Sequence, residues 1–275
     1  MQEYIRTDQY LHQLSQIIAR ANRNFMPEKP DDSHTNLYYD VIGERITGRW
    51  FKAVGKFLTL AIDLDAWQFQ ILQGPRHVLY ACDIVEKTTL QLETTLAAEW
   101  KNMGLDTGNL LAPMHFEIPE YPFAGEALKP AGALDLNRWK AMRRLANETG
   151  LHLLAHLQTP GEVRIWPHHF DTGVYTEPHE DLGIGFGLAM ADQMVPSPYF
   201  YLAAYPSDNR PINYIHLPDL PAGRWIVGDH WKGAVLPLDE LENYSNAVHA
   251  ETTIAYLSTA LNHYYESERR LNTGG

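Results

Sequence analysis

The chain has 275 residues and a formal net charge of −12, from 34 acidic against 22 basic residues. Its content of 45% hydrophobic and 20% charged residues is typical of a folded globular protein and excludes a disordered chain. A protein that binds phosphate backbones needs a basic surplus or a basic stripe. The sequence has neither, so we expect no nucleic-acid partner. The tight basic pairs, Arg143-Arg144 and Arg269-Arg270, fall in the second halves of predicted helices, where we expect solvated faces.

The single cysteine, Cys82, excludes an intramolecular disulfide framework and a cysteine-rich zinc site. We expect it to be a small buried apolar residue. The N-terminus lacks the basic start and apolar stretch of a signal peptide, and no apolar stretch is long enough to span a bilayer. We therefore expect a cytoplasmic protein without a membrane partner.

In the first half of the chain, the spacing of apolar residues predicts a helix, a strand hairpin and a second helix. Apolar residues recur at steps of three and four up to Phe25, with Thr7 or Asp8 available as N-cap. Alternating apolar and polar residues predict a hairpin over 57–72. A second helix is predicted over 88–103, before a glycine that can end it.

The boundary between two halves, 1–118 and 131–275, is predicted in a proline-rich connection that follows a short strand over 115–118. The second half is predicted to open with a helix from Asp135 to before Pro160. Four strands and a closing helix should follow, over 163–175, 182–190, 199–205, 224–227 and 246–270. Helix, antiparallel strands and helix in each half predict an α+β fold with helices packed on one face. An internal duplication is the minority interpretation, because no repeat at fixed spacing supports it.

The sequence lacks the standard nucleotide-binding and catalytic motifs and specifies no cofactor. Its most regular glycine pattern lies in 182–190, where Gly183, Gly185 and Gly187 alternate with apolar residues. This is the period of a strand, and it gives that strand one smooth face against which a large ring can lie. The ring could belong to a neighbouring tryptophan or tyrosine, which is the commoner case, or to a ligand.

The segment Trp-Pro-His-His-Phe-Asp, 166–171, carries the strongest candidate chemistry. Pro167 indicates an edge or the start of a strand, and in an extended segment His169 and Asp171 share one face. Such a pair could bind a metal or perform acid/base chemistry, or it could form a structural hydrogen bond. No third ligand is evident, so no metal site is predicted.

Further candidates lie downstream and in weaker pairs. In Pro-Ser-Pro-Tyr-Phe-Tyr, 196–201, Tyr199 and Tyr201 share a strand face, and the preceding turn holds Asp192. Phenol rings on one face can line a pocket or belong to the core. Two other pairs are interpreted as solvent-facing, on a hairpin turn and on a helix: Asp63 with Asp65, and His152 with His156.

Together, the segments Trp-Pro-His-His-Phe-Asp and Pro-Ser-Pro-Tyr-Phe-Tyr resemble the paired signatures of a bacterial family catalogued as a numbered domain of unknown function. The resemblance extends over almost the whole chain. Members carry a Ser-Pro-Gly-Asp turn between the signatures, where this chain has Leu-Ala-Met-Ala-Asp and keeps only Asp192. The family has no established activity, so the resemblance implies kinship and no reaction. It also implies that one neighbourhood holds His169, Asp171, Asp192, Tyr199 and Tyr201.

The leading functional hypothesis is a small-molecule pocket in the second half, lined by His169, Asp171, Tyr199 and Tyr201 beside Asp192, and floored by the glycine face around Gly185. One alternative is a metal-assisted or His–Asp acid/base hydrolase. The other is a non-catalytic interaction module that uses the aromatic turns around Trp225 and Trp231. The sequence specifies neither the ligand nor the oligomeric state.

Overall fold

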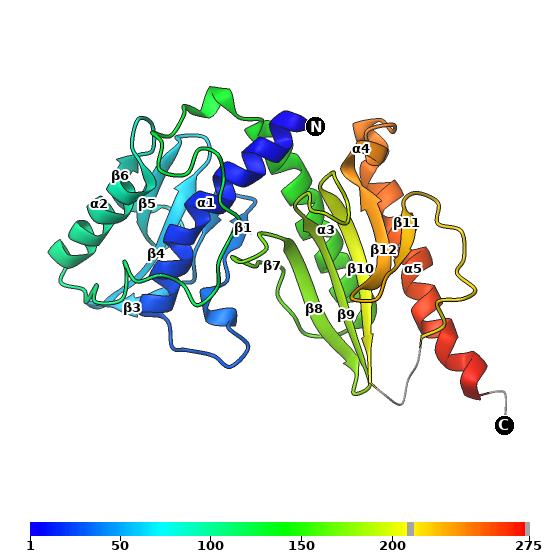
Figure 1. Ribbon diagram of the computed structural model, residues 1–275. Coiled ribbons are helices and arrows are strands. Elements are labelled where there is room, and N and C mark those ends of the chain that lie inside the picture. Colours follow the sequence, from blue (N-terminus) through cyan, green and yellow to red (C-terminus); the bar gives the residue numbers. More distant parts are fainter. Residues whose placement is uncertain (208–211, 273–275) are drawn as a thin grey trace. The chain divides into compact units, whose positions relative to one another are not determined.

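The computed structural model describes residues 1–207 and 212–272, with side chains described as far as 266, and its fold is α+β with antiparallel sheets. The basic pair Arg269-Arg270 lies outside the described side chains. Figure 1 shows the elements along the chain. No helix within the described ranges is long and apolar enough to cross a membrane.

The chain forms two compact units, which we describe separately. The N-terminal unit comprises Gln2–Arg144 and Arg164–Phe170, and the C-terminal unit comprises Leu145–Val163 and Asp171–Gly275 together with Met1. The division differs from the predicted one, because the proline-rich connection lies inside the N-terminal unit. After Gln2 the chain instead passes between the units within the helix α3 (Leu136–Leu157), again between Val163 and Arg164, and again between Phe170 and Asp171.

The sheet of the N-terminal unit has the strand order β1-β2-β4-β5-β6, with β3 also paired to β4. Its strands are β1 (Tyr38–Asp40), β2 (Arg45–Thr47), β3 (Phe51–Ala53), β4 (Lys56–Asp63), β5 (Gln68–Gln73) and β6 (His77–Asp83). The predicted hairpin is confirmed as β4 and β5, in which Leu60 lies opposite Ile71. Cys82 in β6 is buried, as expected. The sequence did not predict β6, because much of this strand is exposed and its apolar residues do not alternate.

The helix α1 (Gln2–Phe25) packs on β4, and α2 (Thr89–Asn102) packs on α1 and, through Trp100, on Phe51 of β3. The helix α2 is confirmed, and Thr88 and Gln91 form a capping box at its start. The prediction of Thr7 or Asp8 as N-cap of α1 was wrong, because the helix begins at Gln2 and buries both side chains. The predicted strand over 115–118 is also absent. The prolines that flank it cannot donate ladder hydrogen bonds.

A buried ion pair joins α1 to the first part of α3. Nη2 of Arg143 and Nε1 of Trp139 both donate to Oδ1 of Asp8, at 2.7 Å each. Nη1 of Arg143 also donates to the carbonyl oxygen of Phe170 at 3.0 Å. The Arg143 side chain is 0% exposed, so the expectation of a solvated face at this residue was wrong. Trp139 and Arg143 are four residues apart and share the inward face of the helix.

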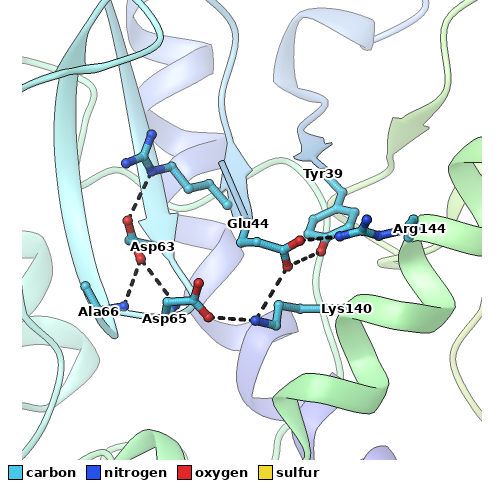
Figure 2. Close-up of polar contacts among 8 residues, drawn as sticks. Tyr39, Glu44, Asp63, Asp65, Ala66, Lys140 and Arg144 are labelled. Carbon is cyan, nitrogen blue, oxygen red and sulfur yellow. Dashed lines mark hydrogen bonds and ion pairs between the residues drawn. The ribbon is translucent and has the colours of Figure 1, made fainter. Parts of the chain in front are cut away.

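The neighbouring arginine points to the surface and belongs to a second network, drawn in Figure 2. Glu44, at a positive φ of 51°, accepts hydrogen bonds from Arg144 and from the Tyr39 hydroxyl, the latter at 2.8 Å. Nζ of Lys140 lies 3.5 Å from Glu44 and 2.6 Å from Asp65. These contacts attach one side of α3 to the two turns that hold Glu44 and Asp65.

Of the aspartates expected to face solvent, Asp65 does so and Asp63 does not. Asp63 is 8% exposed, because its carboxylate has three partners close to the turn of the hairpin. Oδ2 accepts from Nε of Arg45 at 3.1 Å. Oδ1 accepts from the backbone amides of Asp65 and Ala66, at 3.2 and 2.8 Å (Figure 2). The carboxylate thus stabilises the turn between β4 and β5.

In the C-terminal unit, the strands of the sheet follow the order β11-β12-β10-β9-β8. Its strands are β8 (Thr172–His179), β9 (Leu182–Ala189), β10 (Tyr199–Pro206), β11 (Arg224–Val227) and β12 (Lys232–Pro237). The single strand predicted over 163–175 was wrong, because β7 (Arg164–Ile165) ends before a turn and β8 begins after it. The strand β12 was not predicted, and neither was the short helix α4 (Leu238–Leu241).

The two faces of this sheet differ in composition. One is apolar, with Leu182, Ile184, Phe186 and Leu188 of β9 all buried. The helix α5 (His249–Asn272) packs against β10 and β12, and the Tyr264 hydroxyl donates to the Leu202 carbonyl at 3.0 Å. The opposite face carries the β9 glycines and four tyrosines of the neighbouring strands, and we call it the tyrosine face: Tyr175 of β8, with Tyr199, Tyr201 and Tyr205 of β10.

Replacing the buried Arg143 by methionine should destabilise the N-terminal unit by about 3–5 kcal/mol, because Asp8 is left as an uncompensated buried charge. The matched control is Arg144→Gln, which removes a half-exposed ion pair and should cost less than about 1 kcal/mol. Urea unfolding followed by tryptophan fluorescence measures both. Equal losses in the two variants would contradict a structural role specific to Arg143.

Candidate functional site

The Trp-Pro-His-His-Phe segment of the N-terminal unit forms a tight turn, so the extended conformation predicted for it was wrong. The amide of Phe170 donates to the Trp166 carbonyl at 2.6 Å, and Phe170 has a φ of 55°. The turn is held from α1, where Nε2 of His12 and Nε2 of Gln16 both donate to the Pro167 carbonyl, at 2.9 and 2.7 Å. These partners are far away in sequence, and local pattern does not indicate them.

The hydrogen bonds of His12 define its tautomer. A carbonyl oxygen only accepts, so Nε2 carries the proton that is donated to Pro167. Nδ1 therefore accepts from the Tyr121 hydroxyl, at 2.6 Å. The imidazole also stacks on Phe170, with ring centroids 5.3 Å apart. Burial lowers the pKa of His12 to about 4, which keeps the ring neutral and in this bonding pattern at neutral pH.

The structure places His169 and Asp171, the predicted pair, in different units. His169 is exposed, and its ring centroid lies 4.3 Å from that of His168. Asp171 is buried and belongs to the C-terminal unit. Among the described residues, no group of three or more His, Cys, Asp or Glu side chains could hold a metal ion. His152 and His156 are exposed on α3, as expected.

The other predicted residues meet on the tyrosine face as two phenol–carboxylate pairs. The Tyr201 hydroxyl donates to Oδ2 of Asp171 at 2.6 Å. The Tyr199 hydroxyl donates to Oδ2 of Asp192 at 2.8 Å, while Oδ1 of Asp192 accepts from the amides of Met194 and Val195, both at 2.8 Å. Asp192 therefore shapes the turn before β10 and also orients a phenol.

The smooth glycine face of β9 is occupied by tyrosine rings of the adjacent strands. A Cβ atom at Gly187 would lie 2.8 Å from the Tyr201 hydroxyl oxygen, and one at Gly185 would lie 3.0 Å from the Tyr205 ring. A Cβ at Gly183 would lie 2.3 Å from the Tyr175 hydroxyl. The glycines thus leave room for the rings to lie over the strand, and at Gly187 a Cβ would also lie 2.9 Å from the Thr172 carbonyl oxygen. A ligand on this face would touch tyrosines rather than Gly185 itself.

The phenols of this face are held in their protonated form. Burial, followed by the hydrogen bond to Asp192, raises the pKa of Tyr199. Burial and the nearby Asp171 carboxylate raise the pKa of Tyr201 and also that of Tyr205. These hydroxyls therefore act as hydrogen-bonding groups at neutral pH and not as phenolate bases.

The exposed end of the tyrosine face lies outside the predicted pocket lining. The rings of Tyr175 and Tyr205 meet there with centroids 5.8 Å apart, and their side chains are 40% and 47% exposed. The Tyr175 hydroxyl donates to Oε1 of Glu177 at 3.0 Å. Period-two spacing places Tyr175 on the same side of its strand as Asp171, and Tyr205 on the same side as Tyr201. The strand register brings the two pairs onto one face of the sheet.

The tryptophans of the interaction-module hypothesis both pack within the C-terminal unit. Nε1 of Trp225 donates to the Pro218 carbonyl at 2.8 Å, and its ring lies 5.8 Å from that of Tyr264. Trp231 packs against a small apolar cluster that contains Tyr199 and Val235. Both side chains are half-buried.

The chain matches no protein-family model, no curated protein and no solved structure. Function is therefore inferred from the geometry of the units themselves.

The low pKa of His12 predicts a loss of stability in mild acid. The unfolded chain, with a histidine pKa near 6.5, binds a proton that the native state binds only near pH 4. Stability contributed by neutral His12 is thus complete above pH 6.5 and falls as the pH falls towards 4, by about 2 kcal/mol between pH 7 and pH 5. His12→Gln should flatten this slope in urea unfolding, whereas the exposed control His152→Gln should retain it. An unchanged slope in His12→Gln would contradict the assignment.

Proposed function

We propose that the tyrosine face of the C-terminal unit binds a small organic molecule. The observation that carries the proposal is the pair Tyr201–Asp171, at 2.6 Å, on the same face as the pair Tyr199–Asp192. Aromatic rings with a few fixed polar groups are the usual lining of small-molecule sites. Two exposed rings, Tyr175 and Tyr205, extend this face to solvent.

The arrangement favours a rigid binding surface. A tyrosine ring contributes a large contact area with few rotatable bonds. The ring of Tyr201 lies on Gly187, and its hydroxyl is fixed by Asp171. Ordering of this side chain is therefore complete before a ligand arrives, which lowers the entropic cost of association.

Binding is better supported than catalysis by these groups. A tyrosine that acts as a general base needs a lowered pKa, and both Tyr199 and Tyr201 have raised values. Asp171 and Asp192 each accept a phenol proton in a hydrogen bond. The hydrolase hypothesis relies on His169, which belongs to the N-terminal unit, together with Asp171, which belongs to the C-terminal unit.

We also propose kinship with the bacterial family of unknown function. The two signature segments have separate structural roles that support this proposal. Residues 166–170 form the turn held by His12 and Arg143, and Tyr199 and Tyr201 form the phenol–carboxylate pairs. A solved structure of a member with the same turn and the same two pairs would support kinship, and one with a different fold would refute it.

A fragment screen by saturation-transfer NMR on the full chain tests the binding proposal. In spectra of ¹⁵N-labelled protein, hits from the screen should shift the backbone amide signals of Gly183, Gly185 and Gly187. Tyr201→Phe frees the ring from Asp171 and should weaken binding about 2- to 10-fold, because the ring must then be ordered on binding. The control Tyr244→Phe alters a 38% exposed tyrosine elsewhere in the unit and should leave binding unchanged. Hits that respond to His169→Ala but not to Tyr201→Phe would contradict the proposal.

A further inference from the structure

We infer that the ligand of the tyrosine face is an organic cation, with a methylated ammonium group that sits in the corner between the Tyr175 and Tyr205 rings. This inference rests on the proposed function and specifies the chemical class of its ligand.

The shape of the corner is the first observation. The two rings are inclined by 63° with centroids 5.8 Å apart, so they form two walls rather than one flat stack. Their side chains are 40% and 47% exposed. The rings lie over Gly183 and Gly185, where a Cβ would come close to the Tyr175 hydroxyl and to the Tyr205 ring. The corner is therefore open to solvent on one side and supported by backbone on the other.

The second observation is that three of the four tyrosine hydroxyls of the face already donate their proton. Three phenol protons are already donated to carboxylates: Tyr175 to Glu177, Tyr199 to Asp192 and Tyr201 to Asp171. These tyrosines and carboxylates therefore present phenol lone pairs, ring faces and negative charge to a ligand. A neutral ligand rich in acceptors, or an anion, would find little to bind.

The distribution of charge supports the same conclusion. The strands β8, β9 and β10 contain no lysine or arginine. Within the C-terminal unit, the basic residues on the other strands of the sheet are Lys232 on β12, whose Nζ lies over the Tyr214 ring at 5.5 Å, and Arg224 on β11, two strands away from β10. Burial and, after it, the Asp171 carboxylate raise the pKa of the Tyr205 phenol. A cation at the corner is therefore attracted by the carboxylates as well as by the rings.

A metal ion does not fit these groups. Hard cations need several converging oxygen ligands, and within the described residues no cluster of three candidate ligands exists. Each carboxylate of the face instead accepts a hydrogen bond from a different tyrosine hydroxyl. Aromatic walls and diffuse negative charge are the chemistry that recognises a large, weakly hydrated ammonium group.

The test is a titration of the full chain, labelled with ¹⁵N, with choline and with its neutral isostere 3,3-dimethylbutan-1-ol at matched ionic strength. Choline should shift the amides of Tyr175, Gly183, Gly185 and Tyr205 in a saturable manner. The neutral isostere should bind at least several-fold more weakly. Tyr205→Leu should weaken choline binding about 2- to 30-fold, because one cation–π wall is lost.

Two further variants separate the ring from its hydroxyl. Tyr175→Phe keeps the ring and should retain most choline binding, whereas Tyr175→Leu should lose it; Tyr244→Leu is the matched control and should bind as the wild type does. Equal affinity for both probes at these residues would overturn the cation class and leave the binding proposal intact. Absence of shifts with both probes also overturns the cation class, and the fragment screen then decides the binding proposal separately.

Discussion

The hydrogen bond between Tyr201 and Asp171 is the constraint on which the tyrosine face depends. It ties the middle of β10 to the start of β8 across the whole width of β9. A ring can span that distance only if the strand beneath it has no side chains, which is why Gly187 faces the Tyr201 hydroxyl at a distance that a Cβ would not tolerate. The alternating glycines of β9 therefore make room for the tyrosines of the neighbouring strands, and together they give the sheet a rigid aromatic surface.

The segment 166–171, which ends with Asp171, also stabilises the N-terminal unit, through buried polar contacts and ring packing. Phe170, the residue before Asp171, is buried against His12 and Trp139, and its carbonyl accepts from Arg143. Here charged and polar groups are fully buried and are tolerated because they are paired. On the tyrosine face Asp171 is also buried and paired with a phenol, whereas Asp192 and Glu177 are exposed. Residues 166–170 therefore form a structural turn, and the next residue, Asp171, belongs to the candidate binding surface.

Periodic elements were predictable, and long-range polar contacts were not. The hairpin of β4 and β5, the helix α2 and the strand β9 follow from local spacing. Arg143 was misjudged because its partner Asp8 is 135 residues away. The turn at 166–170 was misjudged because His12 bonds Pro167 from 155 residues away. On the tyrosine face, the pattern predicted that Tyr199 and Tyr201 share a side, but it could not indicate that the covering rings would be Tyr175 and Tyr205, since this depends on strand register.

A double-mutant cycle on Asp171→Ala and Tyr201→Phe tests most directly whether this one bond organises the face. Free energies of unfolding of the wild type, both single variants and the double variant give the coupling between the two side chains. The account predicts a coupling of about 1.5–3 kcal/mol, as expected for a hydrogen bond to a charged group. Strictly additive effects would contradict it, because the ring of Tyr201 would then keep its position without the carboxylate.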